Sequence, residues 1–166
     1  RIAIESANVL GLPVLVSEQY PKGLGPTAAE IRTCLGDRVA PIEKLVFSCG
    51  RSPEFRAALD ATGRRDVIIA GVEAHVCVLQ TALDLAADGY AVHVLADGTS
   101  SMSNVDRFYA FDRLSRMPNV FLSTSQSVLM QLIADAKHPK FKDISNLIKA
   151  SLPSPQMPWI QPPPTQ

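Results

Sequence analysis

Two continuous apolar runs, separated by a helical pattern, constrain the fold of this chain more than any other feature. The first run covers residues 67–71 and the second covers residues 91–96. Neither run alternates with polar residues, so we expect both faces of each strand to be covered. Residues 74–88, between them, have the spacing of a helix that ends at Gly89. Strand, helix and strand in this order predict an α/β fold with a mostly parallel sheet.

The same alternation continues toward both ends of the chain. We expect the following elements: the tail of a helix over 2–10 closed by Gly11, a strand over 13–17, a short helix capped by Thr27, a strand over 45–47, a helix capped by Ser52, a helix over 103–116, a strand over 120–122, a helix that starts at Thr124 and a last amphipathic helix over 141–148.

The length of 166 residues suits a single domain, which we place at residues 1–150. Residues 151–166 contain a run of prolines, and we expect them to form an extended, disordered tail.

Composition excludes several classes of function. Hydrophobic residues make up 46% of the chain and charged residues 19%, which allows a real core, and the net charge is zero. Without a basic excess we expect no nucleic-acid partner and no binding to an anionic membrane. No apolar run approaches the ~20 residues of a membrane span. Cys34, Cys49 and Cys77 form no CxxC pair, so we expect free thiols and no zinc site.

Cys77 is the residue with the clearest chemical setting. It follows the strand at 67–71 and falls within the first turn of the next helix, near the carboxyl edge of the sheet, where ligands bind in such folds. Free N–H groups and the helix dipole favour a thiolate there, which is the nucleophilic form of cysteine. The alternative is a small apolar residue that packs the helix onto the sheet, as most free cysteines do. Position alone favours this alternative slightly.

Four separated motifs favour the interpretation of Cys77 as a nucleophile. They are Gly71–Leu85, Ser17–Thr27, Glu43-Lys44 with Phe47-Ser48-Cys49, and His138–Lys142. In this order they resemble the isochorismatase-like, or cysteine hydrolase, superfamily, and within it the isochorismatase domain-containing branch. The resemblance runs from about residue 1 to about residue 149 and implies a three-layer α-β-α, Rossmann-like fold.

The resemblance also assigns roles to individual residues. Cys77 matches the nucleophile, and Lys44 matches the lysine of a Cys, Lys and Asp triad. The family has a cis peptide bond that corresponds to Val72–Glu73 here. The backbone N–H groups of Glu73 and Cys77 are then expected to form the oxyanion hole.

The family's aspartate has no match in this sequence. It lies at the end of the first strand, and this chain starts inside the helix that follows. No other aspartate stands at the matching place, so we expect the first strand to be absent, the triad to be incomplete and the native protein to extend upstream of Arg1. An absent central strand also predicts unpaired sheet edges.

Other residues carry weaker signals. Tyr20, Phe47 and His75 are candidates to line a substrate pocket, although packing explains the aromatic residues equally well. We interpret His93 as a core residue and residues 97–101 as a turn. No Asp-x-His pair stands where nicotinamidases bind metal, so we expect no metal and no cofactor.

The resulting hypothesis is a cysteine hydrolase of a small amide or related acyl substrate. One alternative is a catalytically inactive scaffold of the same fold, whose proline-rich tail engages a partner. Another is a redox-sensing thiol. The resemblance also implies a homo-oligomer in an intracellular compartment, either cytoplasmic or mitochondrial.

Overall fold

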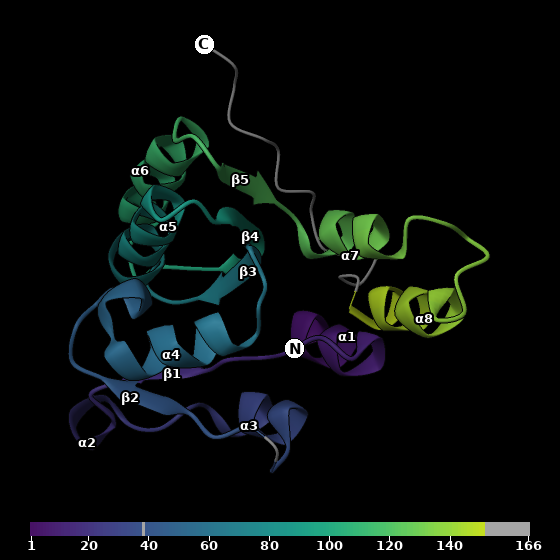
Figure 1. The fold of residues 1–166 in the computed structure, drawn as a ribbon, viewed down its shortest axis with the longest axis horizontal. Helices are drawn as coiled ribbons and strands as arrows, with labels where there is room; N and C mark the ends of the chain where they lie inside the picture. Colours follow the sequence, from purple (N-terminus) through teal and green to yellow (C-terminus); the bar gives the residue numbers. More distant parts are fainter. Residues whose placement is uncertain (38, 152–166) are drawn as a thin grey trace.

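The computed structural model describes residues 1–37 and 39–151. Of the tail predicted over residues 151–166, Ser151 is the last residue of a helix and residues 152–166 lie outside the described residues. Helices and strands alternate along the chain (Figure 1) in this order: α1 (Ile2–Leu10), β1 (Ser17–Gln19), α2 (Pro21–Leu24), α3 (Ala29–Leu35), β2 (Ile42–Lys44), the 3-10 turn η1 (Cys49–Arg51), α4 (Pro53–Ala61), β3 (Asp66–Gly71), the π-helical turn η2 (Ala74–Val78), α5 (Leu79–Ala87), β4 (Ala91–Thr99), α6 (Asn104–Ser115), β5 (Val120–Ser123), α7 (Ser125–Ile133) and α8 (Phe141–Ser151).

The strands form two parallel sheets. One contains β1 and β2, and the other contains β3, β4 and β5 in that order. Within the described residues, β1 and β3 each pair along one edge only. The predicted α/β class with parallel strands is therefore confirmed, and the strands are divided between two separate sheets.

Helices lie on both sides of the three-stranded sheet, as the three-layer prediction requires. Helices α5 and α6 pack on one side, where α5 contacts β4 and α6 contacts β5. Helix α7 contacts β4 from the other side and gathers with α1 and α8 (Figure 1).

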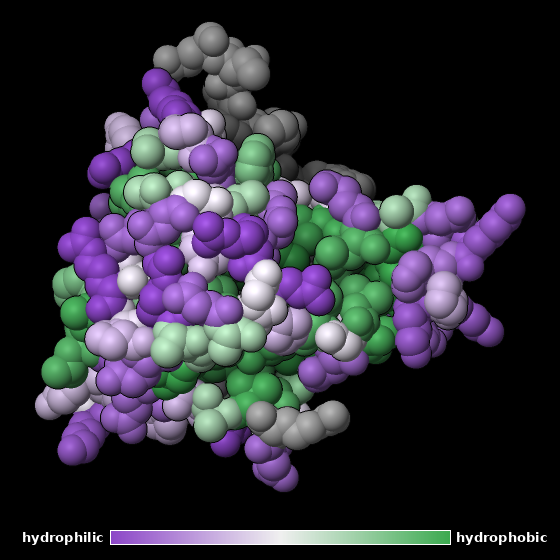
Figure 2. Space-filling model, in the orientation of Figure 1, coloured by the Kyte–Doolittle hydropathy of each residue, from purple (hydrophilic) through white to green (hydrophobic). Residues whose placement is uncertain are grey.

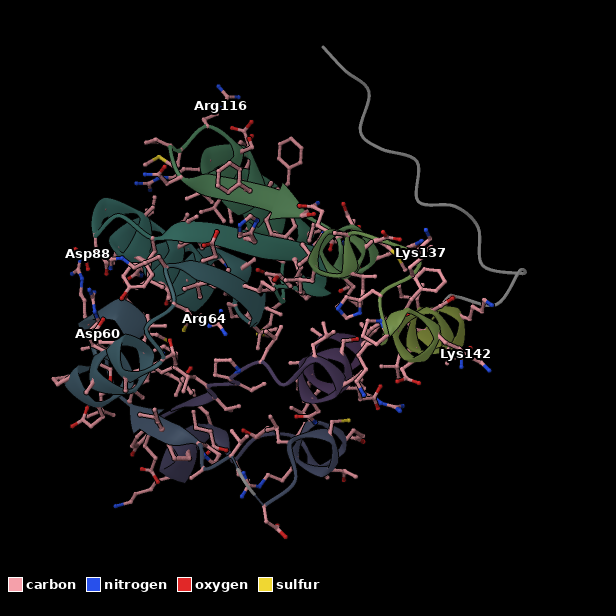
Figure 3. The ribbon with its side chains drawn as sticks, turned by 45° about the vertical axis from the view of Figure 1, so that its right-hand side comes forward. Asp60, Arg64, Asp88, Arg116, Lys137 and Lys142 are labelled. Atoms are coloured by element: carbon pink, nitrogen blue, oxygen red, sulfur yellow. The ribbon has the colours of Figure 1, made fainter. Side chains whose placement is uncertain are left out.

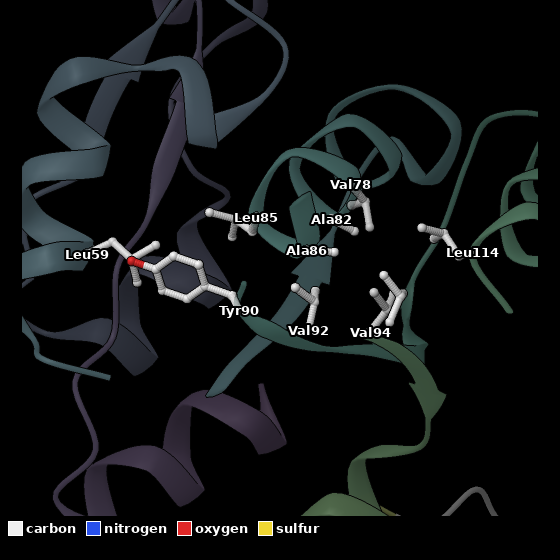
Figure 4. Packing of buried hydrophobic residues seen from close by; sticks show 10 residues of the cluster. Leu59, Val78, Ala82, Leu85, Ala86, Tyr90, Val92, Val94 and Leu114 are labelled. Atoms are coloured by element: carbon white, nitrogen blue, oxygen red, sulfur yellow. The ribbon is translucent and has the colours of Figure 1, made fainter. Parts of the chain in front are cut away.

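The main core lies between the three-stranded sheet and α5 and α6 (Figure 4). Val92, Val94 and Leu114 are fully buried there, and Leu85 is almost so. Burial of one such side chain contributes about 1.5–3 kcal/mol, so this face of the sheet is the main source of stability. A second, smaller cluster joins α7 and α8 to α1.

The opposite face of this sheet is only partly covered. Ile68, His93 and Phe121 lie side by side in register across β3, β4 and β5. Ile68 is 39% exposed and Phe121 is 49% exposed, and the ring of His93 stacks on Phe121 with centroids 5.1 Å apart. The prediction that both faces are covered was wrong here, because the helices on this side do not reach this row. The interpretation of His93 as a core residue was therefore also wrong, because its side chain is only partly buried on this open face.

Several boundaries also differ from the predictions. The strand expected over 45–47 is an exposed bend, and the strand nearby is β2, which ends at Lys44. The strand expected over 13–17 begins only at Ser17. Thr27 does not cap α3, whose N-cap is Ala28. The predicted turn at 97–101 is largely strand, since β4 continues to Thr99.

Polar contacts of Asp97, Ser52 and Thr124 fix the starts of α4 and α7 and connect the end of β4 to α7. The Asp97 carboxylate accepts hydrogen bonds from Ser125 N at 2.8 and 3.0 Å, so it holds the start of α7. Ser52 and Thr124 cap α4 and α7 as predicted. Gly11 ends α1 with φ +66°, a left-handed conformation that glycine adopts without strain.

The surface is mixed in polarity (Figure 2), and some of its charged side chains form ion pairs. Arg56 of α4 bonds both Asp60 and Asp88, and the Tyr90 hydroxyl donates to Asp60 at 2.7 Å. Asp60 and Asp88 lie on the same side of the molecule (Figure 3). The Tyr90 hydrogen bond and the Arg56 guanidinium lower the pKa of Asp60. None of the helices described is both long and apolar enough to cross a bilayer.

Candidate active site

Cys77 lies in η2, the turn that joins β3 to α5. The peptide bond between Val72 and Glu73 is cis, as the resemblance implied. The N–H of Val78 donates to the Glu73 carbonyl at 3.2 Å, a π-type spacing that widens the turn around Cys77. The thiol is partly exposed. Cys77 is therefore accessible and lies in the turn that leads into α5.

Lys44 is the last residue of β2, and only 6% of it is exposed. Its ammonium donates to Gln19 Oε1 at 2.6 Å, to the Phe47 carbonyl at 2.8 Å and to the Val46 carbonyl at 3.1 Å. Cys77 Sγ lies 3.7 Å from the same nitrogen. The structure therefore brings together the two residues that the motifs single out, although Lys44 ends a strand of one sheet and Cys77 lies in the turn after a strand of the other.

Among the described residues, the hydrogen-bond partners of Lys44 include no carboxylate. Its three oxygen partners are neutral carbonyl groups, and no Asp or Glu in the described residues bonds Lys44 or Cys77. Residue 38 and residues 152–166 include no acidic residue. A buried cation gains most from a neighbour that can become an anion, and Cys77 is that neighbour here.

The loop that follows β4 holds the backbone of the cysteine turn. The Ser101 hydroxyl accepts a hydrogen bond from Ala74 N at 3.1 Å and lies 3.0 Å from His75 Nδ1. The Glu73 carboxylate accepts a hydrogen bond from Met102 N at 2.8 Å. Because these bonds act on the residues just before Cys77, the loop fixes the direction in which the thiol points.

A second set of contacts joins the lysine segment to the cysteine helix. The N–H of Cys49 donates to the Thr81 hydroxyl at 2.9 Å, and Arg51 binds Asp84 through two hydrogen bonds of 2.8 and 3.0 Å. A Cβ at Gly50 would lie 3.2 Å from the Asp84 Cβ, so the backbone approaches α5 closely. The Arg51 guanidinium lowers the pKa of Asp84. These contacts tie the chain that follows Lys44 to α5, which follows Cys77.

The three pocket candidates occupy different settings. Tyr20 is 51% exposed, has φ +42° and lies against Gly23. Phe47 is 51% exposed and reaches the site through its carbonyl group. His75 faces the Ser101 hydroxyl. Two surface hollows, one on α7 and one between β1 and α3, are lined by other residues. The lining of a substrate pocket by these three residues stays a prediction.

Cys34 and Cys49 lie apart from this arrangement. Cys34 bonds the Glu30 carbonyl within α3, and Cys49 contacts the Ser17 hydroxyl at 3.3 Å. Within the described residues, no three His, Cys, Asp or Glu side chains are gathered as metal ligands would be.

The sequence interpretation did not assign a role to Gln19 or Ser101. Gln19 lies within a quoted motif, and its role follows once β1 and β2 are known to pair in parallel, which places it opposite Lys44. Ser101 follows the carboxyl end of β4, the kind of position expected to carry function, but it was interpreted as part of a turn.

The sequence matches the isochorismatase domain family over residues 1–126. It is 50% identical over 151 residues to isochorismatase domain-containing protein 1 of Danio rerio, which covers 90% of this chain. The chain thus spans about half, 52%, of the length of that relative.

Solved structures show the same fold. A structure of the MAR1 ribonuclease of Caenorhabditis elegans superposes with a TM-score of 0.85 at 37% identity and covers 96% of this chain and 82% of its own. The YcaC gene product of Escherichia coli, an octameric hydrolase of unknown specificity, has a TM-score of 0.76 at 26% identity and covers 90% of this chain and 78% of its own.

Proposed function

Because the chain belongs to the isochorismatase domain family of hydrolases, we propose that it is the cysteine-bearing part of a hydrolase for a small amide or related acyl substrate. Cys77 is the nucleophile and Lys44 its supporting cation. The observation that carries the proposal is the 3.7 Å approach of Lys44 Nζ to Cys77 Sγ, in a site where Lys44 has only neutral oxygen partners.

In the proposed reaction, the Cys77 thiolate attacks the carbonyl carbon of the substrate. A carbon–sulfur bond forms, the carbonyl oxygen becomes an oxyanion, and the amine then leaves with a proton as the carbon–nitrogen bond breaks. Water attacks the thioester and releases the acid and the free thiol. The ammonium of Lys44 stabilises the thiolate before attack, because opposite charges interact strongly away from solvent.

The oxyanion is expected to bind the N–H groups of Glu73 and Cys77. The N–H of Glu73 donates to no acceptor in the described residues. The Ser101 hydroxyl accepts a hydrogen bond from the N–H of Ala74, and the N–H of Met102 donates to the Glu73 carboxylate, so the loop holds this segment in place. A donor fixed before the reaction is worth about 2.7–4 kcal/mol in such sites. His75 and Phe47 are candidates to contact the acyl group.

The thiol proton also needs an acceptor that can pass it to the leaving amine. The family resemblance assigns this step to an aspartate, and among the residues that the structure describes no carboxylate bonds Cys77 or Lys44. We therefore expect these 166 residues alone to react at Cys77 but to turn over amides slowly. Activity should be measured on the protein as its source produces it.

The test is hydrolysis of a panel of small amides and esters, with intact mass measured during turnover. We expect an acyl adduct on Cys77 and loss of hydrolysis in Cys77→Ser. Full hydrolysis by protein alkylated at Cys77 would exclude the proposal. An unreactive Cys77 together with tight partner binding that survives Cys77→Ser would support the inactive scaffold.

We also propose that the chain assembles with copies of itself. The related YcaC hydrolase is octameric. In this chain, α6 and the loop before it expose several large apolar side chains, namely Met102, Val105, Phe108 and Tyr109. Sedimentation velocity should show an oligomer that Phe108→Glu weakens. A monomer at all concentrations would exclude the assembly.

A further inference from the structure

We propose that Gln19 is a positioning residue that holds Lys44 while leaving its positive charge available to Cys77; the inference rests on the proposed function. Gln19 ends β1 and lies opposite Lys44 in the parallel register of β1 and β2. Its Oε1 accepts a hydrogen bond from Lys44 Nζ at 2.6 Å, and its Nε2 donates to the Leu45 carbonyl at 2.7 Å.

The chemistry of these two partners fixes the orientation of the Gln19 amide. An ammonium group can only donate a hydrogen bond, and a backbone carbonyl can only accept one. The amide oxygen must therefore face Lys44 and the amide nitrogen must face Leu45, since the reversed amide would lose both bonds. Gln19 thus links the Lys44 ammonium to the backbone of the bend that follows it.

The absence of charge on the Gln19 side chain is as important as the position of its amide group. Lys44 has three N–H donors, and its three oxygen partners are the Gln19 amide and the carbonyls of Val46 and Phe47. None of these groups cancels the ammonium charge. Among the described residues, Cys77 is the ionisable partner of the same ammonium, with Sγ at 3.7 Å.

A carboxylate in place of the amide would change the electrostatics and keep the size. It would accept a hydrogen bond from Lys44 equally well, but it would neutralise the ammonium and add a negative charge near the Cys77 thiolate. It would also place an oxygen against the Leu45 carbonyl, which now accepts a hydrogen bond from Gln19. A glutamine at this position therefore forms hydrogen bonds with both Lys44 and the Leu45 carbonyl, and it leaves the ammonium charge beside the Cys77 sulfur unneutralised.

The experiment measures alkylation of Cys77 by iodoacetamide against pH, resolved by peptide mass spectrometry. In Gln19→Glu we expect the rate at neutral pH to fall about tenfold and the pH midpoint to rise by about one unit. Gln19→Met removes both hydrogen bonds without adding charge, and we expect a loss of about threefold. Gln126→Glu makes the same charge change on an exposed residue of α7 and should behave as the wild type.

The pH profile separates this role from a merely structural one, because a packing defect would change stability without shifting the midpoint. Circular dichroism checks that each variant folds. If Gln19→Glu does not fold, Gln19→Met tests the role of Gln19 instead. Lys44→Met, measured in parallel, separates the two proposals. If Lys44→Met alters the profile while both Gln19 variants match the wild type, the role of Gln19 is wrong and the proposed function stands. If Lys44→Met also matches the wild type, the lysine–cysteine pair itself is wrong.

Discussion

The two sheets contribute to the site in different ways. The three-stranded sheet carries Cys77 on a scaffold whose buried residues, such as Val92 and Leu114, are completely removed from solvent. The two-stranded sheet carries Lys44 on three-residue strands, followed by a bend whose side chains are largely exposed. Apolar packing thus holds the nucleophile, whereas hydrogen bonds hold the lysine.

This difference suggests why polar contacts cluster between the two parts. The lysine segment has little apolar surface buried against α5, so the Cys49–Thr81 bond and the Arg51–Asp84 pair set its distance from Cys77. Changes in the core of the three-stranded sheet should therefore act on stability, and changes at these contacts should act on the reactivity of Cys77.

The largest expected effect is on the core. Leu114→Ala removes a fully buried side chain of α6, so the free energy of unfolding should fall by about 2–5 kcal/mol. The matched control is Leu45→Ala, in the bend after β2, where the side chain is 74% exposed and the change should stay within about 0.5 kcal/mol. Urea denaturation measures both. Equal losses would mean that the two parts do not differ in packing.

Thr81→Val tests the link between the two parts. The change preserves size but leaves the buried N–H of Cys49 without its acceptor, which should cost about 1–3 kcal/mol in unfolding free energy. We also expect slower alkylation of Cys77, because Lys44 is then held less firmly. Thr33→Val, on α3, removes an exposed hydroxyl as the control. Unchanged stability would show that this hydrogen bond does not join the two parts.

The Arg51–Asp84 pair should stabilise the protein in a pH-dependent way. The guanidinium lowers the pKa of Asp84 in the folded state, so the stabilisation is present above the unfolded value of about 3.9 and is lost as pH falls through the folded value. Asp84→Asn should therefore lower the thermal midpoint slightly at neutral pH and have a shrinking effect at lower pH. An effect of the same size at all pH values would contradict the ion pair.

The smallest effect is expected on the open face of the three-stranded sheet. Ile68→Thr should change the free energy of unfolding by less than about 1 kcal/mol, because Ile68 is 39% exposed. Val92→Thr, on the covered face of the neighbouring strand, should cost about 1–3 kcal/mol because it buries a hydroxyl group. Comparable losses at both positions would mean that something covers Ile68 in solution.

Local sequence signals predicted the parts of this fold that local chemistry determines. Ser52 and Thr124 cap their helices, Gly11 ends α1, and the apolar runs form β3 and β4. Whether helices cover both faces of the three-stranded sheet could not be predicted in the same way. An apolar run shows that a strand is compatible with burial on both faces, but whether a helix reaches Ile68 depends on the packing of distant segments.

The site was predictable to a similar extent. Cys77 and Lys44 were identified through the family motifs, and their approach to 3.7 Å depends on two sheets meeting in space. Gln19 and Ser101 act through hydrogen bonds to residues 25 and 27 positions away. No local pattern reports such pairings, because they depend on strand register and on where a loop folds back.

The most direct test of this account is the alkylation of Cys77 compared with Cys34 and Cys49 in the same molecule, in the wild type and in Lys44→Met. Cys49 is buried, and Cys34 bonds acceptors in and near α3. The account predicts that Cys77 reacts first at neutral pH and that Lys44→Met slows it about tenfold or more while the other two thiols keep their rates. Equal reactivity of Cys77 with and without the lysine would contradict it.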